Sequence, residues 1–208
     1  MIDTMDDAPT FLGEPPATDE ARRLYELQRV ADGYVWNFTR LWSWRPDVYE
    51  KYVALRSGLM GSSSLTDRDW AVMVTATASA LGDSYCSLAW GPKLARLSDD
   101  ATATDVIGGA EQPAGLSERE AALAVWARRL VRDPNGTERP DVDGLRAVGL
   151  SDREIFEATA FVALRLAFST VNDALGARPD RQLADAAPEQ VRDAVAYGRA
   201  PAAEPSRG

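Results

Sequence analysis

The chain of 208 residues contains no histidine and only one cysteine. Histidine is the side chain whose ordinary pKa lies nearest physiological pH, and it is the commonest metal ligand. Its absence excludes a serine triad, a histidine-bound metal and a cysteine–histidine pair. A lone cysteine also excludes a disulfide within the chain, the usual support of a small secreted fold. The sequence therefore predicts no metal and no other cofactor.

Positive charge and long apolar runs are also scarce. Lysine and arginine number 23 against 32 aspartates and glutamates, which gives a net charge of −9. Phosphate binding needs a cationic face, so this balance argues against a nucleic acid or an anionic membrane as partner. No apolar run approaches the length of a membrane span, and the acidic, proline-containing start is unlike a signal peptide. We therefore expect a cytoplasmic protein.

Strand signals are nearly absent, because the chain has no alternating runs of β-branched residues. Helical patterns fill residues 18–199, whereas residues 1–17 and 200–208 are polar and proline-containing. The length suits one domain of ordinary size. The sequence thus predicts a single all-α domain over 18–199, preceded by a flexible arm and followed by a flexible tail.

Two helices can be placed from their own residues. Thr18 as N-cap and Gly33 as stop delimit an amphipathic run. The segment "RPDVYEKYVALRSGLM" (45–60) carries apolar side chains at spacings of three and four, which predicts one buried helix face. That predicted face consists of Val48, Tyr52, Leu55 and Leu59.

One helix start occurs three times, as "LTDRDWA" (65–71), "LSEREAA" (116–122) and "LSDREIF" (150–156). Each copy has a leucine, then a hydroxyl residue, then an acid three positions after the hydroxyl. This spacing is a capping box, in which the hydroxyl accepts from a first-turn amide and the acid reaches back. The repeats predict three long helices that begin alike.

The only cysteine lies in "ALGDSYCSLAWGP" (80–92). Asp83 precedes Cys86 by three residues and Trp90 follows it by four, so all three share one helical face. Asp83 is either a general acid or base, or the cap of the helix after Gly82. The helix dipole lowers the pKa of a first-turn thiol, whereas the Asp83 carboxylate raises it. Cys86 is accordingly either a nucleophile or an inert, packed thiol.

Several blocks of sequence, in this order, resemble the alkylhydroperoxidase D-like (AhpD-like) superfamily, in its peroxidase-related branch. They run from about residue 34 to 180 and include "GYVWNFTRLWSWRPDVYEKY", "LTDRDWAVMVTATASALGDSYCSLAW", "LSEREAALAVWARRLVRDP", "DVDGLRAVGLSDREIFEAT" and "VNDALGARPD". This superfamily includes the carboxymuconolactone decarboxylases. The resemblance implies an all-helical fold and a symmetric homo-oligomer, a trimer or a hexamer.

The redox motif of that family is degraded here. Its redox members carry C-x-x-C at a helix start, a histidine four residues after the second cysteine and a glutamate fifteen before it. These positions correspond to Asp83, Cys86, Trp90 and Ala71. A dithiol peroxidase needs a second thiol to close its disulfide. The resemblance therefore implies an inherited site that has lost its original chemistry.

Further candidate residues surround this segment. We expect Tyr85 to be a polar group of the pocket. Together with Asp83 and Cys86, it forms the predicted catalytic set. Trp90 replaces an imidazole and is either a pocket wall or apolar packing. The aromatic segment "YVWNFTRLWSW" (34–44) supplies Trp36 and Trp42, as a wall for a ligand or as core and subunit contact.

Two polar residues complete the predicted substrate-binding set. Arg45 can hold a substrate carboxylate with two hydrogen bonds, although surface arginines are commonly just solvated. Asn172 matches a position where relatives often carry asparagine in the last long helix. Its amide either orients a ligand or bonds to a neighbouring backbone group.

Three functions follow, in this order. The first is a non-redox enzyme of lyase, isomerase or decarboxylase type that acts on a small organic molecule. Decarboxylase relatives that lack the dithiol give a precedent by resemblance. The second is a one-cysteine peroxidase served by an external thiol, and the third is a non-catalytic, ligand-binding oligomer. Arginine outnumbers lysine 21 to 2, a bias associated with GC-rich bacteria and hence with bacterial biosynthesis of specialised metabolites.

Overall fold

The computed structural model describes residues 8–203, and every regular element in this range is a helix. The predicted all-α fold is confirmed. None of the helices in this range is long and apolar enough to cross a membrane. The α-helices are α1 (Asp19–Asp32), α2 (Asn37–Trp42), α3 (Pro46–Gly61), α4 (Asp67–Leu81), α5 (Ser84–Leu97), α6 (Asp100–Ile107), α7 (Glu118–Arg132), α8 (Arg139–Ala147), α9 (Asp152–Ala174), α10 (Arg181–Ala186) and α11 (Glu189–Ala194), with one 3₁₀ turn at Pro134–Gly136.

The predicted helix starts are confirmed at the atomic level. In α4, α7 and α9 the cap hydroxyl accepts from the amide of the acid three residues on, and that acid accepts from the cap amide. Each cap of this kind stabilises a helix by about 1 kcal/mol. The hydroxyl of Thr18 accepts from the amide of Ala21 and so caps α1 without a reciprocal acid, and Gly33 ends the helix with a φ of 83°, in the left-handed region. Local sequence therefore determines where these four helices begin.

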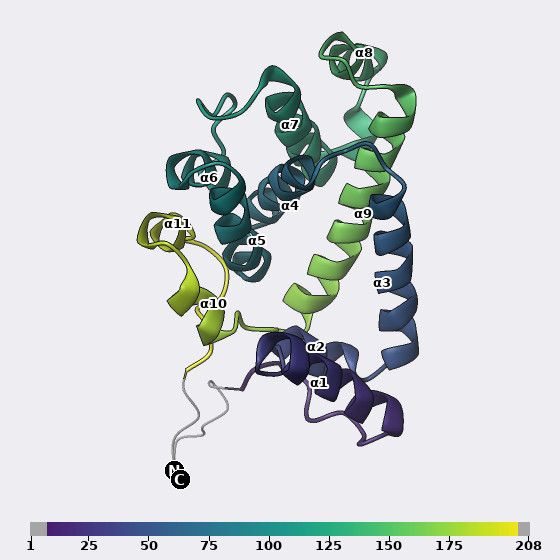
Figure 1. Cartoon of the computed structure of the whole chain (residues 1–208), viewed down its shortest axis with the longest axis vertical. Helices are drawn as coiled ribbons and strands as arrows, with labels where there is room; N and C mark the ends of the chain where they lie inside the picture. Colours follow the sequence, from purple (N-terminus) through teal and green to yellow (C-terminus); the bar gives the residue numbers. More distant parts are fainter. Residues whose placement is uncertain (1–7, 204–208) are drawn as a thin grey trace.

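Helix α4 forms the centre of the domain. All its residues from 69 to 78 are buried, because α5, α6, α7 and α9 pack around it. Figure 1 shows α4 among α5, α6, α7 and α9. Trp70 of α4 meets Phe161 of α9 at a ring-centroid distance of 4.6 Å. The main core thus lies between the α4–α7 group and the long helix α9.

The first three helices close one end of this core. Helices α3 and α9 run side by side, and α1 and α2 lie across their lower ends (Figure 1). The aromatic residues of α2 and α3 meet Phe168 of α9 there, which makes a second apolar cluster around Cys86. This arrangement brings residues from both halves of the chain to the start of α5.

The predicted burial of α3 is wrong for two of its four residues. Val48 is 39% exposed and Leu55 is 60% exposed, and no residue of α3 is fully buried. The reason is tertiary, because the main contacts of α3 within residues 8–203 are with α1, α2 and α9, and the side with Val48 and Leu55 stays exposed. The homo-oligomer expected from the resemblance stays a prediction.

Parts of both expected flexible segments contact the domain. The amide of Phe11 donates to the carbonyl of Leu175, and the amide of Arg178 donates to the carbonyl of Pro9. Near the other end, the amide of Ala202 donates to the carbonyl of Pro179. Residues 1–7 and 204–208 of the expected arm and tail lie outside the described residues, and the predicted domain division stays a prediction.

The close approach of α5 to α6 and α11 gives a test of the fold. A Cβ atom at Gly91 would lie 2.8 Å from Cγ1 of Val191 and 3.0 Å from Cδ1 of Ile107. A Cβ atom at Gly58 of α3 would have no neighbouring atom within 4 Å. We expect Gly91→Val to lower the free energy of unfolding by about 1–3 kcal/mol through overpacking. The matched Gly58→Val should be neutral or slightly stabilising, because valine favours a helix more than glycine does. Equal effects in urea denaturation would contradict this packing.

Candidate active site

The turn between α4 and α5 sets the position of the cysteine. Gly82 ends α4 with a φ of 72°, in the left-handed region, and the chain turns at once into α5. Asp83 is the N-cap of α5, and its Oδ1 accepts from the amide of Cys86 at 2.9 Å. The capping alternative for Asp83 is thereby confirmed. Cys86 is consequently held in the first turn of α5 with its backbone amide already satisfied.

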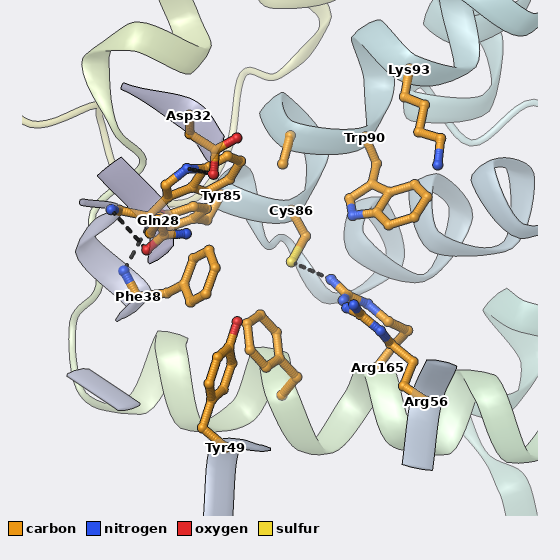
Figure 2. A pocket seen from close by; sticks show the side chains of 13 residues that line it. Gln28, Asp32, Phe38, Tyr49, Arg56, Tyr85, Cys86, Trp90, Lys93 and Arg165 are labelled. Atoms are coloured by element: carbon orange, nitrogen blue, oxygen red, sulfur yellow. Dashed lines mark hydrogen bonds between the residues drawn. The ribbon is translucent and has the colours of Figure 1, made fainter. Parts of the chain in front are cut away.

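A cavity of about 320 Å³ opens beside this turn. Its walls come from α1, α2, α3, α5 and α9 and from Trp36, the residue before α2. Figure 2 shows Cys86 near its centre. The cavity is lined by Gln28, Asp32, Trp36, Phe38, Tyr49, Arg56, Tyr85, Cys86, Ala89, Trp90, Lys93, Arg165 and Phe168.

The thiol of Cys86 faces a buried guanidinium group. Nη2 of Arg165 donates to Sγ at 2.8 Å, and the hydroxyl of Ser169 lies 3.6 Å from the same sulfur (Figure 2). Cys86 is only 3% exposed. Burial and then the Asp83 carboxylate raise the pKa of this thiol to about 12, against the opposing effect of Arg165. The thiol is therefore protonated at neutral pH, and it does not rest as a thiolate.

Asp83 itself does not line the cavity. It has no exposed surface, and its Oδ2 has no hydrogen-bond partner among the described residues. Its carboxylate acts on the site through the Cys86 amide and through space. A role for Asp83 as acid or base toward a substrate stays a prediction, and the geometry shows a capping group that tunes the thiol.

Tyr85 lines the cavity with its ring, while its hydroxyl is engaged elsewhere. That hydroxyl donates to Oδ2 of Asp180, and the amide of Asn37 donates to Oδ1 at 3.0 Å. Burial raises the pKa of Asp180 to about 6, although both hydrogen bonds favour its charged form. Asp180 is not part of the cavity wall. The structure thus presents Tyr85 to the cavity as an aromatic surface.

The predicted substrate-binding residues divide into two groups. Trp36 and Trp90 line the cavity. Trp42 lies behind the wall, stacked on Phe168 at 5.4 Å between centroids, and its Nε1 donates to Oδ1 of Asn172 at 2.9 Å. The fully buried Asn172 therefore holds a side chain of the core, and neither it nor Trp42 reaches the cavity.

Arg45 lies outside the site. It is exposed at the start of α3, and its Nε and Nη2 donate to the two carboxylate oxygens of Asp47 at 2.8 and 2.9 Å. The bidentate carboxylate contact expected of this arginine exists, but its partner is a neighbour in sequence. Arg45 lines no wall of the cavity around Cys86.

The sequence prediction missed the cationic part of the site. Arg56, Lys93 and Arg165 all line the cavity. Arg165 carried a visible signal, because it stands alone among apolar residues in "FVALRLAF" (161–168), and an isolated charge in a buried helix face requires compensation. No comparable signal marked Arg56, which reaches the site only because α3 packs beside α9.

The expected absence of a metal stays a prediction. Within residues 8–203 no group of three or more cysteine, aspartate or glutamate side chains lies close enough together to hold an ion.

The two roles of Asp83 can be separated by substitution. Asparagine keeps an oxygen that caps α5, so we expect the free energy of unfolding of Asp83→Asn to equal or exceed that of the wild type. Asp83→Ala removes the cap and should lose about 1 kcal/mol. Urea denaturation at neutral pH measures both. If asparagine were as destabilising as alanine, the cap could not be what the carboxylate contributes.

Comparison with known proteins bears on the fold. The sequence matches no protein-family model and no curated protein. Among solved structures, it is similar to the alkylhydroperoxidase AhpD core of an uncharacterized peroxidase-related protein from Ralstonia eutropha JMP134, with a TM-score of 0.74 and 21% identity over 85% of this chain and 95% of that one. An uncharacterized peroxidase-related protein from Silicibacter sp. TM1040 gives a TM-score of 0.75 and 23% identity over 84% and 94%.

A third similar structure is the debrominase Bmp8. Its apo form has a TM-score of 0.69 and 14% identity, over 94% of this chain and all of that one. A cysteine-to-alanine variant of Bmp8 in complex with 2,3,4-tribromopyrrole aligns with the same TM-score. Likeness at these identities establishes architecture and nothing finer. The chain has the AhpD-like fold, with one cysteine where the redox members of that superfamily carry a pair.

Proposed function

We propose that the protein is a non-peroxidatic enzyme that transforms a small organic molecule in the cavity beside Cys86. The observation that carries this proposal is the contact between a protonated, buried thiol and the Arg165 guanidinium inside an aromatic-lined cavity. The reaction is of lyase, isomerase or decarboxylase type, because a protonated thiol can supply a proton to carbon. The catalytic residue is Cys86, which lines the cavity, and Asp83 positions it.

The chemistry balances without an oxidant or a reductant. In a decarboxylation, the bond between the substrate carbon and its carboxyl group breaks and carbon dioxide leaves. The electron pair stays on that carbon, which takes the proton from Sγ of Cys86. Arg165 stabilises the thiolate that results, because its Nη2 already donates to the sulfur. A proton from water then restores the thiol.

The debrominase supports a small, flat organic substrate. A cysteine variant of that protein was solved with a bromopyrrole, which is a planar ring. The cavity of this chain is walled by rings such as Trp36, Phe38 and Phe168, which suit a planar molecule. Its volume lies at the small end of the range for ligand pockets. Both features favour a substrate with few atoms beyond one or two rings.

A one-cysteine peroxidase remains the second candidate. The contact with Arg165 favours it, because a nearby cation lowers the pKa of a thiol and so favours the nucleophilic thiolate. Two of the similar structures are described as peroxidase-related. Against it, burial and Asp83 outweigh Arg165, so that the thiolate is a minor species at neutral pH.

Proton transfer to carbon can be detected without knowing the product. We expect the wild type, incubated in D₂O with a panel of unsaturated lactones and aryl and alkenyl carboxylates, to introduce deuterium into at least one compound by ¹H NMR. Cys86→Ala should lower that rate about 100-fold or more, the usual scale of acid–base catalysis. Hydroperoxide consumption with an external thiol should not exceed that of Cys86→Ala. Peroxide reduction that depends on Cys86 would instead establish the second candidate.

A further inference from the structure

The cavity beside Cys86 is positively charged within an acidic protein. Three of its lining residues are cations, Arg56, Lys93 and Arg165, and one is a carboxylate, Asp32. Oδ2 of Asp32 accepts a hydrogen bond from Nε1 of Trp36 at 3.0 Å, on the side of the cavity away from the cations (Figure 2). The whole chain carries a net charge of −9, so the cavity is opposite in sign to the chain as a whole.

Within residues 8–203, none of these three cations has a carboxylate partner. No ion pair within 4.0 Å involves Arg56, Lys93 or Arg165 among the described residues, although most other arginines of the chain are paired. Arg165 is 3% exposed, and its Nε has no hydrogen-bond partner; neither has the buried Nε of Arg56. A buried charge without a partner destabilises a fold by several kcal/mol. Such groups are kept where a ligand supplies the missing charge.

Asp83 compensates only part of this charge. Its carboxylate raises the pKa of Arg165 through space, yet the two groups do not form an ion pair. Its Oδ1 is bound to the Cys86 amide, which fixes it below the cavity wall. Asp83 lies at a distance, and Asp32 already accepts a hydrogen bond from Trp36. The three cations therefore outnumber the carboxylates that could neutralise them.

The three cations converge on one side of the cavity. Nζ of Lys93 lies 4.5 Å from the centre of the Trp90 ring, and the guanidinium of Arg165 lies 5.8 Å from the same ring. Arg56 and Arg165 both lower the pKa of Tyr49 and Tyr52, so the two guanidinium groups share one neighbourhood. Figure 2 shows Arg56, Arg165 and Lys93 on one side of Cys86.

Aromatic rings make up the other side. Phe38 meets Tyr85 at 5.8 Å and Phe168 at 5.3 Å between ring centroids, and Trp36 lies 6.4 Å from Tyr85. In Figure 2 Phe38 and Tyr85 lie across the cavity from the cations, with the sulfur of Cys86 between the two sides. A ligand that satisfies both sides has a flat apolar body and one anionic end.

We propose that the substrate is a small planar carboxylate, whose carboxyl group binds Arg165, Arg56 and Lys93 and whose ring packs against Phe38 and Trp36. This assignment rests on the proposed function, since it names the substrate class of the same cavity. Guanidinium groups match a carboxylate in geometry and can hold it with two parallel hydrogen bonds. A phosphate dianion fits less well, because the first-turn amide of Cys86, which could bind a phosphate oxygen, already donates to the Asp83 carboxylate. The bound carboxyl group lies next to the thiol, as a decarboxylation or a proton transfer requires.

Binding calorimetry with 2-naphthoate and its neutral isostere 2-naphthamide tests the charge. We expect the wild type to bind naphthoate at least tenfold more tightly than naphthamide, with an affinity that falls as salt is added. Arg56→Gln and Lys93→Gln change half-buried residues, so they should fold; each should weaken naphthoate about tenfold and leave naphthamide unchanged. Arg96→Gln, at an exposed position of α5 outside the cavity, is the matched control and should bind naphthoate like the wild type.

Two results would overturn the proposal. The first is that the wild type binds naphthoate and naphthamide with equal affinity, or binds neither detectably at millimolar concentration. The second is that Arg56→Gln and Lys93→Gln bind naphthoate no more weakly than Arg96→Gln does. The test is independent of turnover, because Cys86→Ala should still bind naphthoate. A failure of the proposed function would therefore leave charge-dependent binding intact, and a failure of carboxylate binding would leave deuterium incorporation to be observed with an uncharged lactone.

Discussion

Burial of a guanidinium group destabilises a protein by several kcal/mol unless nearby groups compensate for the water it loses. Arg165 meets this constraint only in part, with the sulfur of Cys86, with the faces of Phe168 and Trp90, and with the more distant charge of Asp83. These partners come from α5, from the turn before it and from α9 itself. The contact therefore ties the start of α5 to the middle of α9, and the cavity is built around that junction.

The rest of the fold acts on the site through this junction. The Gly82–Asp83 turn places the thiol and caps its helix, while burial and then the Asp83 carboxylate raise the pKa of the thiol. The N-terminal helices add Arg56 and the rings that cover Cys86. Much of the positive charge thus stands assembled before a ligand arrives, so binding an anion requires little reorganisation. With no histidine in the sequence and a single cysteine, the site offers a buried, protonated thiol beside a guanidinium group.

The sequence predicted features that depend on neighbours along the chain. The capping boxes, the α1 boundaries and the cap at Asp83 involve residues three positions apart, so their patterns are visible without the fold. Features that depend on tertiary packing were missed or wrong. Leu55 fits an apolar helical stripe, yet it is exposed in the structure. Arg45 forms its ion pair with Asp47, two residues away, rather than with a ligand. The meeting of Arg56 with Arg165 requires α3 to lie beside α9, which no local pattern encodes.

The rate at which iodoacetamide alkylates Cys86, followed between about pH 7 and pH 10, tests most directly whether a protonated thiol faces Arg165. Only the thiolate reacts, and an ordinary cysteine is half ionised near pH 8.5. With a pKa of about 12, the wild-type rate should rise about tenfold per pH unit without a plateau. Asp83→Asn should react faster, because a negative charge that raises the pKa is gone, and Arg165→Gln should react more slowly. A plateau near pH 8.5 that neither substitution moves would contradict the account.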